Sequence, residues 1–164
     1  MQTIVIKLAI FSVAFGFVEA SVVVYLRHLL GASQPAISPN GILFLVPGIA
    51  FLEPRTALEI ITDTQILNVE RIREASTVVM LASIAALSGK NFSQKIAYFF
   101  FIFGIWDIFY YIFLNLTIGW PKSPRDLDIF FLLPTPWVGP VVVPIAMSSV
   151  LIVASLIFLA KRRQ

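Results

Sequence analysis

Three carboxylate side chains interrupt the long apolar segments of this 164-residue chain. Glu19 lies inside the apolar run 4–30, Glu74 near the start of a second run, and Asp107 inside a third. A carboxylate within a membrane-spanning helix is costly and faces protein or a water-filled cavity rather than lipid. Such a group can exchange a proton, bind a cation, act as a general base or pair with arginine. We therefore expect these residues to form either a functional site or a set of interhelical ion pairs.

Further polar side chains share helix faces with these carboxylates. Tyr110 and Tyr111 follow Asp107 at three and four residues, a spacing that places side chains on one helix face. At about 1.5 Å of rise per residue, all three carboxylates fall in the outer half of the bilayer. The sequence thus predicts one outward-opening pocket, with Arg27 or Arg73 in contact. The candidate ligand- or ion-binding residues are Glu19, Arg27, Glu70, Arg73, Glu74, Asp107, Tyr110 and Tyr111.

The sequence identifies neither the ligand of such a pocket nor any cofactor. Glu19, Glu74 and Asp107 would suit a hard cation such as Mg²⁺, Ca²⁺ or Mn²⁺, although their spacing matches no dedicated metal motif. His28 is the single histidine, so two histidines of one chain cannot ligate a haem. The chain has no cysteine, which excludes disulfides, thiolate metal ligands and cysteine nucleophiles.

Arginines near the carboxylates raise an enzymatic alternative. Arg27, Arg71, Arg73 and Arg125 could hold a lipid phosphate by bidentate contacts. A neighbouring carboxylate, Glu74 or Asp107, would then act as general base in an intramembrane enzyme for a phosphorylated lipid or polyprenyl substrate. The chain contains no glycine-rich phosphate loop and no zinc-protease helix to support this alternative. A small proton-coupled transporter is a third hypothesis.

Composition places these residues in a membrane protein. The chain is 59% hydrophobic and 13% charged, against about 45–50% and 25% in soluble domains. The net charge of +3 does not indicate nucleic-acid binding, because several of the basic residues flank apolar runs. The sequence predicts an all-α fold, a four-transmembrane-helix bundle forming a single integral membrane domain over 1–164. The expected spans are about 3–30, 69–89, 92–117 and 138–160.

The first span is expected to be retained rather than cleaved as a signal peptide. Val18-Glu19-Ala20 loosely resembles a small-residue cleavage site, but the apolar run continues beyond it through residues 22–26.

Two long connections contain many proline and turn residues. Residues 31–41 are turn-rich, and the apolar run 41–52 is too short to span and is broken by Pro47-Gly48, so a re-entrant or interfacial piece is expected. An interfacial lead-in helix is expected within 56–68. The prolines of 121–140 predict an irregular segment that dips into the interface, with Trp120 and Trp137 as anchors.

Basic residues predict the orientation. Lys90, Lys95 and the tail Lys161-Arg162-Arg163 fall on one side of a four-span arrangement. By the positive-inside rule that side is the cytoplasm, so both termini are expected there and the Pro-rich connections face outward.

Three strings, REAST at 73–77, WDIFYY at 106–111 and LPTPWVGP at 133–140, resemble those of small uncharacterised bacterial multi-pass membrane proteins. The resemblance implies residence in a bacterial or archaeal cytoplasmic membrane and supplies no activity. Four helices enclose little interior, so we expect a ligand- or ion-binding subunit of an oligomer or larger membrane complex. The expected partners are lipids and protein, not nucleic acid.

Overall fold

The computed structural model describes residues 2–30 and 41–161, which form two compact units. The helical unit comprises 2–24, 79–120 and 144–161, and the sheet unit comprises 25–30, 41–78 and 121–143. Helices α1 (Gln2–Leu30) and α3 (Thr64–Ser88) contribute to both units. The expected turn-rich stretch lies outside the described residues over 31–40, as do Arg162 and Arg163 of the basic tail.

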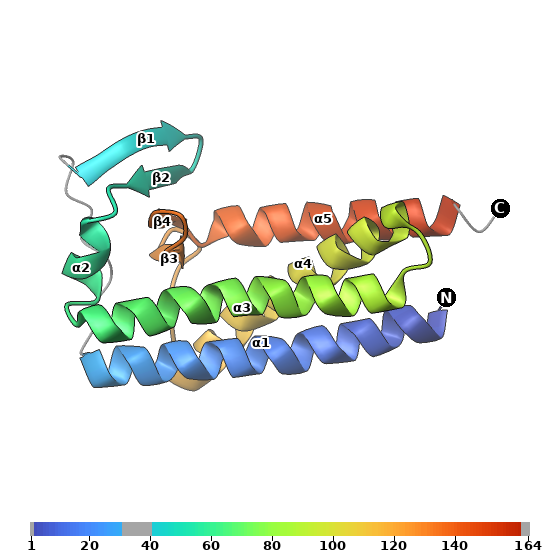
Figure 1. The fold of residues 1–164 in the computed structure, drawn as a ribbon, viewed down its shortest axis with the longest axis horizontal. Coiled ribbons are helices and arrows are strands. Elements are labelled where there is room, and N and C mark those ends of the chain that lie inside the picture. Colours follow the sequence, from blue (N-terminus) through green and yellow to red (C-terminus); the bar gives the residue numbers. More distant parts are fainter. Residues whose placement is uncertain (1, 31–40, 162–164) are drawn as a thin grey trace. The chain divides into compact units, whose positions relative to one another are not determined.

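The helical unit also contains α4 (Phe92–Ile118) and α5 (Val142–Lys161), the latter from residue 144 onward (Figure 1). Both ends of α4 are capped. The Asn91 side chain accepts a hydrogen bond from the Gln94 N–H at 3.0 Å. Gly119 takes a left-handed conformation, with φ of 65°, and donates its N–H to the Asn115 carbonyl at 3.0 Å. The helix therefore coincides with the span expected at 92–117.

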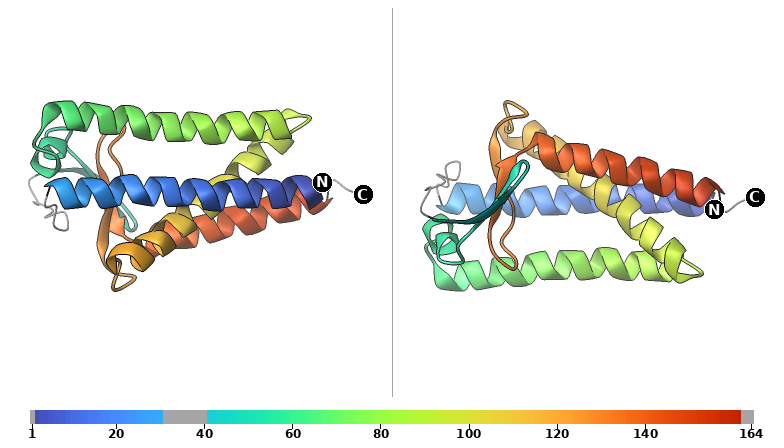
Figure 2. Two further views of the ribbon diagram at one scale, coloured as in Figure 1. Left: turned by 90° about the horizontal axis from the view of Figure 1, so that it is seen from below. Right: turned by 90° about the horizontal axis from the view of Figure 1, so that it is seen from above.

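Helix α4 lies between α1 and α5, and one glycine marks each contact. A Cβ atom at Gly16 of α1 would lie 3.0 Å from the Trp106 carbonyl oxygen of α4. A Cβ atom at Gly104 of α4 would lie 2.7 Å from the Ser148 carbonyl oxygen of α5. Because neither position carries a side chain, the helix backbones approach closely, as is common in membrane helix packing. Figure 2 shows α4 running obliquely across both neighbours.

Helices α1 and α4 run in the same direction, and α5 runs in the opposite one (Figure 2). The first residues of α1 and the last residues of α5 consequently lie at the same end of the helical unit (Figure 1).

Three helices of the described chain are long and apolar enough to cross a membrane, namely Gln2–Leu29, Phe92–Ile118 and Val142–Lys161. They fit a membrane location, as the composition predicts. Helix α3 is not among them, because four charged residues fall at positions 70–74.

Helix α3 nevertheless buries acidic side chains and exposes large apolar ones, and Leu67, Leu81 and Ala85 share its buried face. Its buried residues recur at spacings of three and four and include Glu70, Glu74 and Thr77. Its exposed residues include Val69, 67% exposed, and Leu87, 84% exposed. A helix in water buries its apolar face and exposes charge, so the buried acidic and exposed apolar side chains depart from the usual pattern.

The sheet unit contains a four-stranded antiparallel sheet and the short helix α2 (Thr56–Ile60). The strands are β1 (Ile42–Val46), β2 (Ile49–Leu52), β3 (Leu127–Phe131) and β4 (Trp137–Pro140), in the spatial order β1-β2-β4-β3. Residues of β2 and β4 form the centre of one sheet face, where Ala50, Leu52 and Val138 pack together. The Leu52 N–H donates to the Pro136 carbonyl at 2.9 Å, and the Thr135 hydroxyl donates to the Leu52 carbonyl.

This sheet corrects the all-α prediction. The run at 41–52 forms a hairpin, and the segment 121–140, expected to be irregular, contains two strands. The prolines do not prevent this arrangement, because Pro47, Pro134 and Pro136 lie between strands and Pro140 ends one. Helix α5 accordingly begins at residue 142, not 138, and α3 begins at 64, not 69. The four-helix bundle and the re-entrant placement stay predictions.

Candidate functional site

Asp107 of α4 and Ser148 of α5 form a buried polar contact in the helical unit. The Ser148 hydroxyl donates a hydrogen bond to Asp107 Oδ2 at 2.7 Å, and the two residues are 2% and 9% exposed, respectively. Gly104 lies one turn before Asp107 and allows the backbone of α5 to come within reach. An interhelical hydrogen bond in a membrane contributes about 0.6 kcal/mol on average. A central carboxylate costs about 3 kcal/mol on insertion scales, so this hydrogen bond by itself does not offset the cost of burying Asp107.

Glu19 occupies the face of α1 that contacts α4. Gly16, which touches the backbone of α4, precedes it by three residues, and Ala20 beside it is fully buried. Glu19 itself is 7% exposed, whereas Phe17 and Val18 between these positions are exposed. The Ser12 hydroxyl, buried one turn before Gly16, donates to the Leu8 carbonyl at 2.8 Å. Ser12, Gly16 and Glu19 therefore lie along the protein-facing side of α1.

Both carboxylates of the helical unit lie within one helical turn of the α1–α4 contact. Asp107 adjoins Trp106, whose carbonyl oxygen meets Gly16, and Glu19 lies about 4.5 Å of helical rise beyond Gly16. Tyr111, 4% exposed, lies one turn further along α4, and its ring centroid is 4.8 Å from that of Tyr110. Glu19, Asp107 and the two tyrosines thus lie at similar positions along α1 and α4, and the hydroxyl that binds Asp107 belongs to the third helix, α5.

The other predicted site residues belong to the sheet unit. Arg73 donates to Glu70 through Nε at 2.8 Å and through Nη2 at 2.6 Å, which is a bidentate pair along α3. Glu74, 7% exposed, accepts the Leu132 N–H at 2.8 Å and so fixes the segment between β3 and β4.

Arg27 pairs with a carboxylate that the sequence analysis did not single out. Its Nη2 atom lies 3.0 Å from Oδ1 of Asp128, and the Asp128 side chain is 5% exposed. Asp128 is the single charge in the apolar run 127–133, and that isolation is the signal that would have found it. The sequence does not single out Ser148 in the same way, because α5 also contains Ser149 and Ser155 and nothing distinguishes the three serines.

Among residues 2–30 and 41–161, no three histidine, aspartate or glutamate side chains are grouped as metal ligands. His28 and Arg125 are exposed. The Nε atom of Arg71 is buried and has no hydrogen-bond partner. The single outward-opening pocket, which would join Glu74 to Glu19 and Asp107, stays a prediction.

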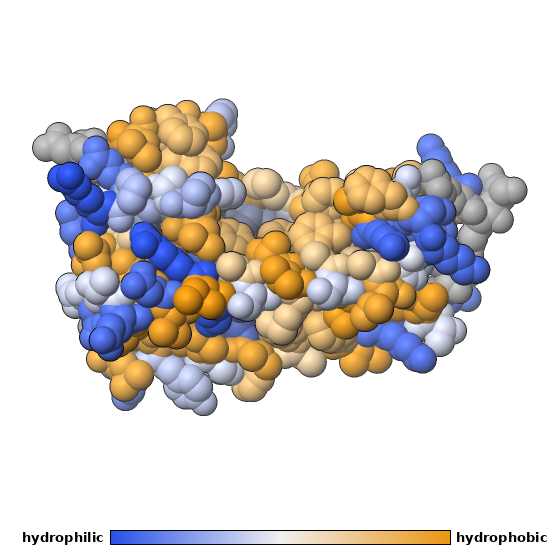
Figure 3. Space-filling model, viewed as in Figure 1, coloured by the Kyte–Doolittle hydropathy of each residue, from blue (hydrophilic) through white to orange (hydrophobic). Residues whose placement is uncertain are grey.

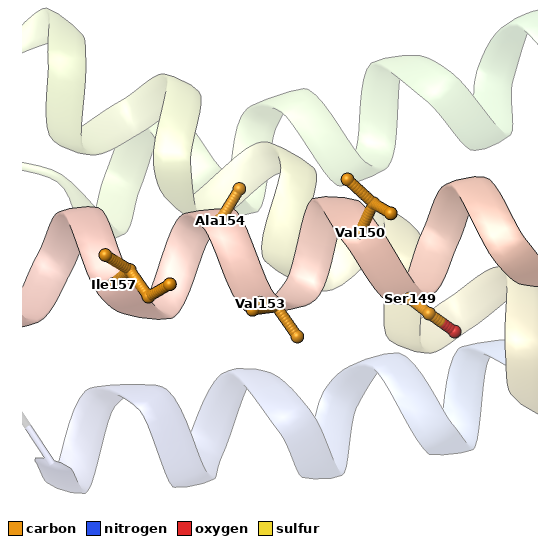
Figure 4. A pocket seen from close by; sticks show the side chains of 5 residues that line it. All are labelled: Ser149, Val150, Val153, Ala154 and Ile157. Atoms are coloured by element: carbon orange, nitrogen blue, oxygen red, sulfur yellow. The ribbon is translucent and has the colours of Figure 1, made fainter.

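A shallow hollow on α5 is distinct from this polar site. Figure 4 shows its lining, Ser149, Val150, Val153, Ala154 and Ile157, all contributed by α5. The Ser149 hydroxyl donates to the Ile145 carbonyl of its own helix at 2.8 Å, so the hollow presents an essentially apolar surface. Apolar, exposed helix surface of this kind suits lipid contact.

Three of the described helices fit a membrane location, and comparison with known proteins adds no narrower class. No protein-family model, curated protein or solved structure matches this chain.

Proposed function

We propose that this protein is a small multi-pass protein of a bacterial or archaeal cytoplasmic membrane that binds a proton or small cation at intramembrane carboxylates. The observation that carries the proposal is the buried Asp107 carboxylate with the Ser148 hydroxyl against it. A hydroxyl both donates and accepts hydrogen bonds, so it can serve a carboxyl group in either protonation state. Glu19, on the α4-facing side of α1, supplies the second acidic group of the site.

Four crossings are proposed, with α3 as the additional span. The directions of the helices support this proposal, because α1 and α4 run the same way in the helical unit (Figure 2). A chain that leaves the membrane at the end of α1 must return before α4 begins. Helix α3 has 25 residues and a length of about 37 Å, against a hydrocarbon thickness of about 30 Å. Its exposed apolar surface also suits lipid or a partner helix.

Both termini are proposed to be cytoplasmic. The first residues of α1 and the last residues of α5 lie at the same end of the helical unit as the α3–α4 turn (Figure 1). Lys90, which is exposed in that turn, adds positive charge at this end. The protein would act as a subunit of an oligomer or larger complex, with membrane lipids as its other partners. Exposed apolar surface along α5, including Val150 and Val153, leaves room for such contacts.

Ligand-dependent stability in detergent tests the binding proposal. Thermal unfolding of the purified protein should depend on pH or on Na⁺, K⁺, Mg²⁺ or Ca²⁺, since a ligand at 100 times its Kd stabilises by about 2.7 kcal/mol. Asp107→Asn keeps the size of the side chain and a hydrogen-bond acceptor, and should abolish that dependence while the protein stays folded. Glu53→Gln, which removes an exposed carboxylate outside the candidate spans, is the control for altered charge. An equal dependence in wild type and Asp107→Asn would refute the proposal.

The second candidate is an enzyme for a phosphorylated lipid or polyprenyl substrate. The observation in its favour is the buried Arg71 Nε without a partner, which leaves a donor for an anionic group near Arg73. Loss of co-purified phospholipid in Arg71→Gln, together with loss of turnover in Glu74→Gln, would favour this enzyme over the ion-binding subunit.

A further inference from the structure

One face of the sheet carries an aromatic row with one ring from every strand. Phe44 of β1 stacks on Phe51 of β2, with ring centroids 4.2 Å apart. Phe51 lies 5.0 Å from Trp137 of β4, and Trp137 lies 5.9 Å from Phe131 of β3. These residues are also the paired positions of the strands, so the row follows the strand register.

A bulge in β1 places Phe44 in this row. Ile42 pairs with Leu52, which belongs to the opposite face, and the register shifts before Phe44 pairs with Phe51. An inserted residue turns the side chains that follow it toward the other face of a strand. Without the shift at residue 43, Phe44 would lie on the same face as Ile42 and the row would end at Phe51.

Strand β1 exposes apolar side chains on both faces. Leu43, Phe44, Leu45 and Val46 are 50%, 51%, 68% and 40% exposed, and successive side chains of a strand alternate between faces. The hairpin from 41 to 52 contains no charged or polar side chain. Figure 3 shows the continuous hydrophobic surface over β1 and β2. A sheet edge in water is normally protected by charge, and this edge has none.

The chain holds this hairpin close to a membrane-spanning segment. Strand β2 is hydrogen-bonded to β4, and only Val141 separates the end of β4 from the start of α5. That connection reaches about 7 Å, so β4 cannot lie far from the beginning of the span. The exposed apolar surface of α5 is thus connected through β4 to the uncharged β1–β2 hairpin.

The unpaired backbone groups at the open edge of β1 limit how deeply the hairpin can enter a bilayer. Val46 and Ile49 flank the two-residue loop, so they form the hydrogen-bonded pair that closes the hairpin. Pairs alternate in an antiparallel ladder, so the next residue, Leu45, directs its N–H and C=O away from β2. Unpaired backbone groups are not tolerated in the hydrocarbon core. At the headgroup level, water still reaches them, and aromatic rings are favoured there.

We propose that the β1–β2 hairpin is a lipid-binding surface that lies at the headgroup–acyl boundary of the leaflet where α5 begins. Its partner is the bilayer interface, with Phe44, Phe51 and Trp137 at the level of an aromatic belt. The hairpin anchors the sheet unit to the membrane without crossing it.

Depth-dependent fluorescence quenching tests this inference in the full chain. The chain has no cysteine, so Leu45→Cys gives a single labelling site, and Lys122→Cys, exposed and polar in the same unit, is the matched control. Each variant is labelled with an environment-sensitive fluorophore and reconstituted in phosphatidylcholine–phosphatidylglycerol vesicles. The Leu45→Cys label should be quenched by lipid brominated near the headgroup. Aqueous iodide should quench it on the order of tenfold less than the Lys122→Cys label, because an anion partitions poorly into the interface.

Three results would overturn the inference. Equal quenching of both labels by iodide places the hairpin in water. Stronger quenching by lipid brominated near the acyl ends places it in the hydrocarbon core. Protection from both quenchers, together with oxidative cross-linking between two unlabelled Leu45→Cys chains, assigns the strand edge to a second copy. Thermal unfolding of each labelled variant in detergent should match wild type, since both positions are exposed.

Discussion

The helical unit and the sheet unit both bury carboxylates, but the partners around those carboxylates differ. In the sheet unit, Asp128 pairs with the Arg27 guanidinium and Glu74 accepts a backbone N–H. In the helical unit, Asp107 accepts a hydrogen bond from the Ser148 hydroxyl. A guanidinium and an amide N–H only donate, whereas a hydroxyl can also accept. On these contacts we propose that Asp128 and Glu74 hold the fold, whereas Asp107 can gain and lose a proton.

The largest expected effect is in the sheet unit. Arg27→Met leaves the Asp128 carboxylate buried without its guanidinium. Loss of one partner of a buried ion pair costs about 3–5 kcal/mol, and we expect about 3 because the Arg27 side chain is 25% exposed. The measurement is the free energy of unfolding in mixed detergent micelles.

The double variant Arg27→Met with Asp128→Leu is the control for this prediction. It removes both charges and should recover most of the lost stability, as buried pairs replaced by apolar residues often do. If the double variant were as unstable as Arg27→Met alone, a loss of packing and not an unpaired carboxylate would be responsible.

An intermediate effect is expected where α4 meets α5. Gly104→Ala would place a Cβ atom 2.7 Å from the Ser148 carbonyl oxygen and force the helices apart. Overpacking of this kind costs about 2 kcal/mol. The separation should also weaken the Asp107–Ser148 hydrogen bond, so the cation or pH dependence of thermal unfolding should diminish together with stability.

Gly16→Ala provides the matched comparison, because its Cβ atom would meet α4 at 3.0–3.3 Å. It should cost less, about 1 kcal/mol, and leave the ligand dependence closer to wild type. A larger loss of ligand dependence in Gly16→Ala than in Gly104→Ala would move the site from the α4–α5 contact to the α1–α4 contact.

The smallest effect on stability is expected at the proposed site itself. Ser148→Ala removes one interhelical hydrogen bond and should lower the free energy of unfolding by about 0.6 kcal/mol. It should nevertheless reduce the pH- or cation-dependent shift in Tm, which Ser148→Thr should retain because threonine keeps a hydroxyl. A loss of about 3 kcal/mol in Ser148→Ala would instead place this hydrogen bond among the interactions that hold the fold.

The helices were more predictable than the sheet. The span at 92–117 needs only a long apolar run, a capping Asn91 and a terminating Gly119, and all three are visible in the sequence. The sheet depends on pairing between Ala50 and Val138, which no local pattern specifies. The apolar run 41–52, broken at Pro47-Gly48, also fits a β-hairpin. In a membrane protein, a short apolar run of this kind fits an interfacial segment equally well, so the hairpin was not predicted.

The candidate site was predictable in its charges but not in its partners. Glu19, Glu74 and Asp107 are charged residues in long apolar segments, so each was expected to face protein rather than lipid. The structure buries all three side chains. Their partners depend on helix rotation and on the close approach at Gly104, which a single sequence does not fix. Ser148 is one of three serines in α5, and nothing local separates it from Ser149.

The ion pair between Arg27 and Asp128 also sets an order of events during synthesis. Its partners are 101 residues apart in the chain, and those of the Glu74–Leu132 hydrogen bond are 58 apart. At about 5–20 residues per second, a ribosome needs roughly 5–20 s to supply Asp128 after Arg27. In the proposed four-span arrangement, α1 and α3 would enter the bilayer before Asp128 and Leu132 are available to Arg27 and Glu74. On that proposal, the contacts that tie Arg27 and Glu74 to Asp128 and Leu132 form only after β3 and the segment that follows it have been synthesised.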